Sequence, residues 1–358
     1  MFENSKNNLD IMEKDTLPSF CQMEKWITSE ICDKNGGIYS WQRGKELGYL
    51  YNEITGYGVK LYTCLYDIFK DPKYLQMAKR SVDYLNSQVS SSYGGGISRG
   101  GIYYVFDASI CLSGILSYHD CMTDNKFIDE KANYLHEKMT KELLNFIYRS
   151  LLDKKPINLN GTSPENVDFS HWSLSYGSHL LKCAIAISQS LNVFNNDSEK
   201  LDALIDRLCT DMVKNFHNGH FHKNINSREI YTHSHCYATE GLIYLNKPEY
   251  LDVIKESANW LASIQNHNGS LYNNYFSSKQ QEEVADVTSQ AVRIWLWTDR
   301  EKFSDNIEKG FGFLKSLQSP EGGIYYKTGS KDINSWVTMF TMNDIIWDHN
   351  GANAKWLI

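Results

Sequence analysis

Apolar residues recur at helical spacing along most of the chain, and the segments that carry them come in pairs. The clearest pair covers residues 51–69 and 73–86, where Asp71 and Pro72 supply a break and a proline suited to a helix start. Similar pairs cover 106–122 and 127–148, 172–191 and 201–216, 237–245 and 249–265, and 287–297 and 303–317. Segments 18–32 and 336–347 are left over at the two ends, and they form a further pair if the ends meet.

A glycine turn, usually followed by an aromatic or isoleucine-bearing stretch, recurs between the pairs. It occurs as NGGIYSW at 35–41, YGGGIS at 93–98, NG at 160–161, NGHF at 218–221, NGSLYNNYF at 268–276 and EGGIYY at 321–326. Each interval is long enough for two helices of average length and their connections. Six turns therefore predict six helical hairpins.

The end segments favour a closed ring over an open array. An open array of hairpins needs polar outer faces at its ends, whereas FCQMEKWI and WVTMFTMNDIIW are as apolar as the internal segments. The sequence predicts an all-α fold, an (α/α)6 toroid that forms one domain over residues 1–358, with short β-turn loops at one end. Residues 1–16 are expected to form a flexible N-terminal arm. The first helix of each pair is apolar nearly all round and is assigned to the inner ring, while the more amphipathic second helix is assigned to the outer ring.

Charge and targeting features narrow the possible partners. The formal net charge is −7, and no Lys- or Arg-rich run is interleaved with aromatic residues, so neither nucleic acid nor an anionic membrane is expected as a partner. No apolar run approaches the ~20 residues of a membrane span, and the first residues lack the basic start and apolar core of a signal peptide. We therefore expect a cytoplasmic protein. The eight cysteines, scattered without a CxxC spacing, are expected to be buried thiols.

The ring predicts where ionisable residues meet. Inner helices that point the same way gather their N-terminal ends at one mouth, where the helix dipoles favour polar or anionic ligands. Titratable residues near five of these ends are the catalytic candidates: Glu53, Asp107, His171, His235 and Asp286. N-capping alone would explain an aspartate, but glutamate is a poor N-cap, which makes Glu53 the strongest candidate.

Two types of sugar chemistry fit these candidates, and the sequence does not choose between them. Hydrolysis of a glycosidic bond needs two carboxyl groups, available from Glu53, Asp107 and Asp286. Epimerisation or β-elimination needs a base and an acid on opposite faces of the sugar, for which His171 and His235 are suited.

Aromatic residues and arginines in the same turns and helix starts are the substrate-binding candidates. They are Trp41, Tyr57, Arg99, Trp172, Tyr237 and Trp336. Aromatic faces suit sugar rings, and an arginine suits the carboxylate or phosphate of an acidic or nucleotide-linked sugar. Two groups could suggest zinc, but neither has the spacing of zinc ligands: His233, His235 and Cys236, and His217, His220 and His222. We expect no metal, and the sequence indicates no cofactor.

Four segments carry a family resemblance: YNEITGYG at 51–58, VFDASICLSGIL at 105–116, HSHCYATEGLIYL at 233–245 and DVTSQAVRIW at 286–295. They resemble a bacterial toroid family whose members are often encoded with polysaccharide-biosynthesis genes. More distantly, the chain resembles the six-hairpin superfamily of glycoside hydrolases, polysaccharide lyases and N-acylglucosamine 2-epimerases.

The resemblance implies a carbohydrate-active enzyme of bacterial surface-glycan metabolism. It would act by acid/base chemistry, as a hydrolase, lyase or epimerase, on a sugar or oligosaccharide. Two alternatives stay open. One is a non-catalytic glycan-binding or scaffold subunit of a polysaccharide synthesis complex, and the other is an isoprenoid enzyme similar to the terpenoid cyclases, suggested by the many aromatic residues.

Overall fold

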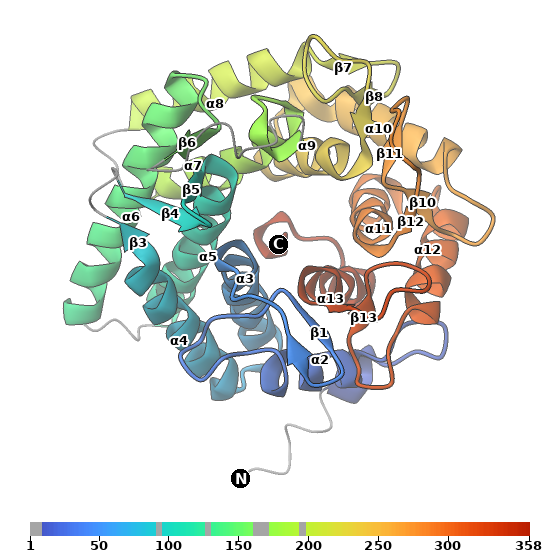
Figure 1. The fold of residues 1–358 in the computed structure, drawn as a ribbon, viewed down its shortest axis with the longest axis horizontal. Helices are drawn as coiled ribbons and strands as arrows, with labels where there is room; N and C mark the ends of the chain where they lie inside the picture. Colours follow the sequence, from blue (N-terminus) through green and yellow to red (C-terminus); the bar gives the residue numbers. More distant parts are fainter. Residues whose placement is uncertain (1–8, 91–94, 126–129, 160–171, 193–197) are drawn as a thin grey trace.

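Two concentric layers of helices surround one axis (Figure 1). The structure, a computed structural model, describes residues 9–90, 95–125, 130–159, 172–192 and 198–358, with only the backbone for 130–136. The inner layer contains α3 (Asn52–Phe69), α5 (Val105–Asp124), α7 (Ala184–Leu191), α9 (Thr232–Leu245), α11 (Ala285–Asp299) and α13 (Ser335–Asn350). The outer layer contains α2 (Phe20–Ser29), α4 (Pro72–Gln88), α6 (Glu130–Leu152), α8 (Ser198–Val213), α10 (Leu251–Ser263) and α12 (Ser304–Ser316). Inner and outer helices alternate along the chain, which confirms the (α/α)6 toroid.

The third inner segment departs from the single helix predicted over 172–191. Two 3-10 helices, η4 (Trp172–Leu174) and η5 (Ser178–Cys183), precede α7 there. Gly177 lies at the break with an extended backbone, and a Cβ atom at this position would be 2.3 Å from the carbonyl oxygen of Lys223. The Ser178 amide donates to the same oxygen at 3.3 Å. This close approach to a neighbouring loop explains why the helix starts late.

A threonine ties each of three inner helices to the glycine turn that precedes it. Its hydroxyl accepts the backbone N–H of the residue just after the turn. The pairs are Thr55 with Ile38 (3.0 Å), Thr288 with Leu271 (3.1 Å) and Thr338 with Ile324 (2.9 Å). The same hydroxyl donates to the carbonyl of the helix N-cap residue, four positions earlier. The bonds pair a buried backbone donor and hold the turn over the start of the helix.

The glycines of the described turns are required because these turns pack against the backbone of the next outer helix. Gly269 has φ +90°, and a Cβ atom there would lie 2.0 Å from the carbonyl oxygen of Lys309 on α12. Gly36 has φ +96°, and a Cβ atom there would lie 2.3 Å from the carbonyl oxygen of Arg80 on α4. Both the backbone conformation and the available space exclude a side chain.

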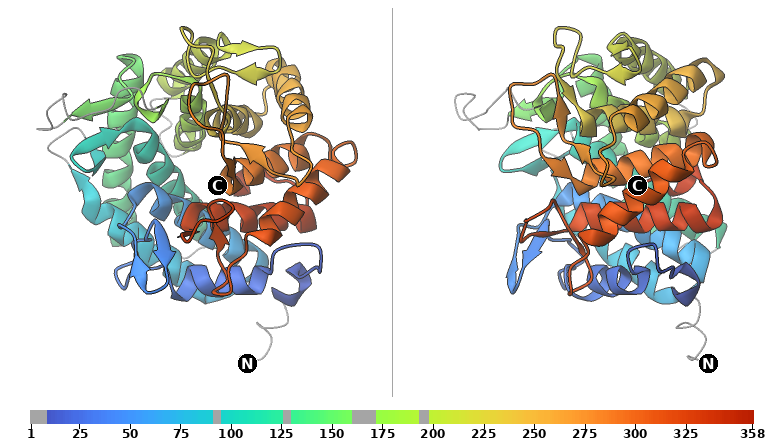
Figure 2. Two further views of the ribbon diagram at one scale, coloured as in Figure 1. Left: turned by 45° about the vertical axis from the view of Figure 1, so that its right-hand side comes forward. Right: turned by 90° about the vertical axis from the view of Figure 1, so that its right-hand side faces the viewer.

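Short strands follow the turns and gather at one end of the ring (Figure 2, right). One sheet contains β13 (Ile324–Tyr325), β14 (Ile333–Asn334), β1 (Trp41–Arg43) and β2 (Glu46–Leu47), and another contains β3 (Val89–Ser90), β4 (Gly96–Arg99), β5 (Ile102–Tyr104) and β6 (Ile157–Leu159). Three antiparallel pairs join β7 (Phe216–His217) to β8 (His220–Phe221), β9 (Ile230–Tyr231) to β11 (Asn274–Tyr275), and β10 (Leu271–Tyr272) to β12 (Glu283–Val284). Trp41 of β1 lies opposite Asn334 of β14, so the two ends of the chain meet and the ring closes as predicted.

The segment after α13 turns back into the ring and blocks the end opposite the strands. The C-terminus lies near the ring axis (Figure 1), and Leu357 and Ile358 are fully buried. Asn343, half-way along α13, donates to the carbonyl of Trp356 at 2.9 Å. The ring is therefore closed at this end and open at the end that carries the strands.

The N-terminal residues differ from the flexible arm expected over 1–16. The 3-10 helix η1 (Asp10–Met12) buries Met12, and Lys14 forms an ion pair with Asp348 of α13 at 2.7 Å. Residues 10–16 thus pack against the ring, while residues 1–8 lie outside the described part of the chain. None of the helices in the described segments combines the length and apolar character needed to cross a membrane.

Candidate functional site

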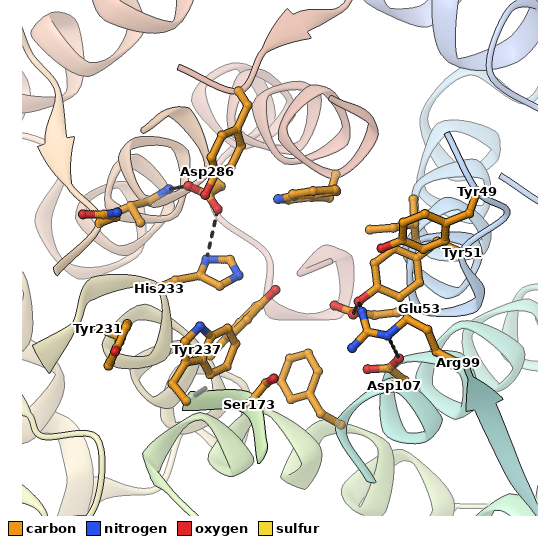
Figure 3. Close-up of a pocket in the computed structure, with 17 residues that line it drawn as sticks. Tyr49, Tyr51, Glu53, Arg99, Asp107, Ser173, Tyr231, His233, Tyr237 and Asp286 are labelled. Atoms are coloured by element: carbon orange, nitrogen blue, oxygen red, sulfur yellow. Dashed lines mark hydrogen bonds and ion pairs between the residues drawn. The ribbon is translucent and has the colours of Figure 1, made fainter. Parts of the chain in front are cut away.

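A cavity of about 410 Å³ opens at the N-terminal end of the inner helices, and we call it the cup (Figure 3). Five inner helices contribute the residue two positions after their N-cap. These are Glu53 of α3, Phe106 of α5, His233 of α9, Asp286 of α11 and Trp336 of α13. Because the helices point the same way, this position faces the ring axis in each first turn. Side chains from distant segments therefore meet at one opening.

One side of the cup holds two carboxyl groups and an arginine (Figure 3). Tyr51 donates its hydroxyl hydrogen to Glu53 Oε2 at 2.5 Å, and Arg99 Nη1 donates to the Tyr51 hydroxyl. Arg99 Nε lies 3.6 Å from Asp107 Oδ2. A hydrogen bond also joins the carboxyl groups of Glu53 and Asp107. We call these four residues the acid cluster.

Burial and mutual repulsion leave the acid cluster with a bound proton. Burial, and next the charge of Asp107, raise the pKa of Glu53 to about 8, against the opposing effect of Arg99. Burial also raises the pKa of Asp107, but Arg99 and the hydrogen bond from Glu53 oppose that rise. Two carboxyl groups in contact rarely ionise together. At neutral pH, Glu53 therefore carries a proton that it can donate.

The other side of the cup holds an imidazole and a carboxylate. His233 and Asp286 lie across the cavity from the acid cluster in Figure 3, with Nδ1 of His233 3.7 Å from Asp286 Oδ2. Burial lowers the pKa of His233, although the charge of Asp286 opposes this effect. The imidazole is therefore neutral at pH 7 and has one nitrogen able to accept a proton.

The hydrogen bonds beneath His233 determine which nitrogen accepts. Glu240 pairs with Lys182 at 2.8 Å and with Arg293 at 2.9 Å, and although burial favours its neutral form, these cations hold its pKa below the usual value. A charged carboxylate only accepts hydrogen bonds, so Gln290 must turn its Nε2 toward Glu240, at 3.1 Å. Gln290 Oε1 then faces His233 Nδ1 at 2.6 Å, and Nδ1 must be the donor. The lone pair is left on Nε2 of His233.

Seven of the eleven predicted site residues line the cup: Glu53, Asp107, Asp286, Arg99, Trp172, Tyr237 and Trp336. Tyr57 lies one layer deeper, where its hydroxyl donates to that of Tyr237 at 3.0 Å. Trp41 lies in β1 outside the cup, with the guanidinium of Arg43 5.4 Å from its ring centre. His171 falls outside the described residues.

His235 does not reach the cup, so its expected place at the mouth is wrong. It is fully buried behind α9, where its Nδ1 accepts the Phe221 N–H at 3.1 Å and its ring contacts Trp260 edge-on. This is the bond that a threonine hydroxyl makes in three other hairpins, at the same position four residues after the N-cap. Burial lowers the pKa of His235 to about 3. His235 is therefore a neutral structural residue.

His233 takes the place that the sequence analysis gave to His235. The error came from starting the helix at residue 237, whereas α9 begins at Thr232. Residues two apart on a helix point about 200° apart, so only one of the two histidines can face the axis. Aligning the helix starts by their N-cap residues would have identified His233. Tyr51 and Tyr231, the N-cap residues of α3 and α9, also line the cup, as do Asn273 and Tyr326 from the loops.

No group of three or more His, Cys, Asp or Glu side chains within the described segments is arranged to hold a metal ion. The ionisable groups of the cup instead lie beside one another, with Arg99 next to Asp107 and His233 next to Asp286. Their arrangement offers a proton donor and a proton acceptor on opposite sides of one cavity.

The ring of six hairpins with a polar cup at its helix N-termini defines the class of (α/α)6 toroids. Cellobiose 2-epimerase from Bacillus thermoamylovorans is similar to this chain, with a TM-score of 0.68, 16% sequence identity, and coverage of 91% of this chain and 98% of that chain. A sugar epimerase from a ruminal bacterium has a TM-score of 0.65 at 13% identity, covering 90% and 98%. Unsaturated glucuronyl hydrolase from a Bacillus species has a TM-score of 0.65 at 12% identity, covering 99% of both chains. At these identities the similarity establishes the fold. No protein-family model and no curated protein matches the sequence.

Proposed function

We propose that this protein is an enzyme that moves a proton between opposite faces of a sugar bound in the cup. The observation that carries the proposal is the pairing across one cavity of a protonated carboxyl group, Glu53, with an imidazole nitrogen, His233 Nε2, that holds a lone pair. A buried carboxyl group whose pKa is raised toward neutrality, paired with an imidazole that is neutral at pH 7, is typical of general acid/base catalysis. Similar structures include two sugar epimerases and a glucuronyl hydrolase, which supports a sugar as substrate.

Epimerisation next to a carbonyl group uses these groups most directly. His233 Nε2 takes the proton from the carbon beside the carbonyl, and the electron pair of the C–H bond moves into an enediolate. Glu53 returns a proton to the opposite face of that carbon, which inverts it. Glu53 is then ionised beside Asp107, and Arg99 compensates the added charge. Proton exchange with water restores His233 and Glu53 to their starting forms.

The charges of the cup favour a neutral sugar over an acidic or nucleotide-linked one. Among the described residues that line it, Arg99 is the one permanent cation, and it is already engaged with Asp107 and Tyr51. Asp107 and Asp286 face the same cavity, and negative charge on them would repel an anionic substrate. The rings of Phe106 and Tyr237, with centroids 4.8 Å apart, offer apolar faces to a sugar ring.

Glycoside hydrolysis is the second candidate, and the position of Asp286 favours it. Glu53 would protonate the leaving oxygen, while Asp286, on the opposite side of the cup, would activate a water molecule. A role in bacterial surface-glycan metabolism remains a proposal that follows from the sequence resemblance. A scaffold subunit needs neither a proton donor nor an acceptor in the cup, and an isoprenoid site needs mostly apolar walls, so both fit the cup less well.

Proton NMR in D2O distinguishes these functions in one experiment. The panel contains neutral reducing mono- and disaccharides, with unsaturated uronyl disaccharides for comparison. Epimerisation exchanges the proton beside the carbonyl for deuterium and produces the epimer, whereas hydrolysis releases a new reducing end without exchange. We expect Glu53→Gln and His233→Asn each to abolish turnover while leaving substrate affinity within a few-fold. Absence of turnover by the unmodified protein on the whole panel would refute the enzyme and favour the scaffold.

A further inference from the structure

A second cavity, of about 400 Å³, adjoins the cup between two of its hairpin loops. We call it the side cavity. Tyr84 and Gln88 of α4, Leu50, Asn52, Ser98 and Gly100 line it alone, and Tyr49, Tyr51 and Arg99 line both cavities. These three side chains form the wall between the two. A ligand that extends past them from the cup enters the side cavity.

The common wall presents flat rings and a planar guanidinium group. Tyr49 is 51% exposed, and its ring centre lies 5.2 Å from that of Tyr51. The guanidinium of Arg99 lies 4.7 Å from the Tyr51 ring centre and 4.4 Å from that of Tyr104. These contacts hold Arg99 in place between the two cavities. A rigid aromatic surface bordering two cavities suits a chain of sugar rings.

Amide side chains also line the side cavity. Asn52 lies in its wall, where its Nδ2 donates to the carbonyl of Ser98 at 3.3 Å. An amide group can both donate and accept hydrogen bonds, which suits the hydroxyl groups of a sugar. With the amide of Gln88 near by, the lining is aromatic and amide-rich, as a neutral polyhydroxyl ligand requires.

We propose that the side cavity binds the second sugar unit of a neutral oligosaccharide whose reacting unit lies in the cup. This inference rests on the proposed function and adds that the substrate contains at least two linked sugars. The glycosidic link would pass over Tyr49 and Arg99. Gln88 is exposed at the end of α4, in the outer layer, so further units would continue into solvent.

The proposal is tested by measuring how affinity depends on chain length. Calorimetry with glucose, cellobiose, cellotriose and cellotetraose gives the dissociation constants of the unmodified protein. We expect a gain of at least about tenfold from one sugar to two, and little gain beyond three. Gln88→Ala and Tyr84→Ala should remove most of this gain without changing the affinity for glucose. Tyr84 also packs near Gly37, so Tyr84→Ala could disturb the fold, whereas Gln88 is an exposed surface residue. Gln88→Ala therefore tests the proposal even if Tyr84→Ala does not fold.

Tyr148→Ala provides a matched control. Tyr148 lines a cavity of about 390 Å³ beside α6 and α8, which shares no described residue with the cup or the side cavity. The Tyr148→Ala substitution should leave the dissociation constant of every sugar unchanged. Equal affinity for glucose and the longer sugars would overturn the proposal, and so would an equal loss at all lengths in Gln88→Ala. Absence of binding by every sugar would overturn it as well.

Failure of the two proposals would look different. If the side cavity is not a sugar site but the proposed function holds, turnover occurs with a kcat/KM that does not rise with chain length. If the proposed function fails but the side cavity binds sugar, affinity rises with length while no sugar is converted. Binding and turnover therefore report on the two proposals separately.

Discussion

Replacing Glu53 by glutamine should make the folded protein more stable, and more so as the pH rises. Glu53 is buried beside Asp107, which is why its pKa is about 8 in the folded protein against 4.5 in an exposed chain. Between these values the unfolded chain has released the proton and the folded protein has kept it. Stability therefore falls as pH rises through this window.

The pKa values set the size of the effect. At about 1.4 kcal/mol for each pH unit, the buried carboxyl group of Glu53 lowers the free energy of unfolding by about 3 kcal/mol at pH 7 and by up to about 5 kcal/mol above pH 8. Glutamine is neutral in both states and avoids this loss. Its amide keeps both contacts, since Oε1 can accept from Tyr51 and Nε2 can donate to Asp107. Below pH 4.5 both states of the parent hold the proton, and the two proteins should have nearly equal stability.

Urea denaturation of both proteins at pH 4.5, 7 and 8.5 measures the difference. Glu46→Gln is the control, because Glu46 is exposed on β2 and its carboxyl group lies in water in both states. We expect Glu53→Gln to gain stability steadily with pH while losing turnover at every pH, and Glu46→Gln to change neither. A difference between Glu53→Gln and the parent that is the same at all three pH values would refute the argument, since the Glu53 carboxyl would then titrate alike in both states.

Three further predictions test the parts of the fold that support the cup. In urea denaturation, the free energy of unfolding of His235→Thr should stay within about 1 kcal/mol of the parent value. That of His235→Ala should fall by about 1–3 kcal/mol, because the substitution leaves the buried N–H of Phe221 unpaired. Equal losses would contradict the role that His235 shares with the threonines. Gln290→Met should lower kcat at least about tenfold with little change in KM, and nitrogen-15 NMR should show His233 in both neutral tautomers; an unchanged tautomer would remove Gln290 from the mechanism. Gly269→Ala should lower the free energy of unfolding by more than about 2 kcal/mol. Gly329→Ala should lower it by about 1 kcal/mol, because Gly329 has φ +76° but open space around it. Similar losses would show that packing of Gly269 against α12 is unimportant.

The spacing of apolar residues and the glycine turns were sufficient to predict the fold, because both patterns reflect which positions are buried. The glycine turns within the described segments mark places where the chain packs against a neighbouring backbone, and Gly269 shows how little room that leaves. Helix ends were less predictable. Inner helices start with residues such as Thr232 and Ser234 that look polar in the sequence but are buried in the ring, so the first turn of α9 was assigned to a loop. The break at Gly177 depends on a contact with Lys223, which no local pattern reveals.

The site was predictable as far as helix position determines direction. Glu53, Asp286 and Trp336 are each two residues after an N-cap, and all three were expected at the mouth and line it. His235 was expected there too, but the uncertain start of α9 moved the assignment by two residues. Hydrogen-bond partners such as Gln290 were out of reach, because its link to His233 joins side chains on the inner helices of two neighbouring hairpins, and the sequence pattern does not specify how those helices pack.

In the first two turns of the inner helices, the residues that face the cup and the residues that stabilise the fold occupy different positions. Two residues after the N-cap, side chains face the cup and differ from helix to helix, as Glu53 and His233 do. Four residues after it, threonine or His235 faces away from the cup and holds the glycine turn. Six residues after it, side chains form a layer beneath the cup, where Tyr57 bonds to Tyr237 and Gln290 orients His233. Helical geometry points these positions in different directions, so the residues that face the cup can change without disturbing the bonds that hold the glycine turns. A toroid can therefore acquire new chemistry at its mouth while its hairpins keep their structure.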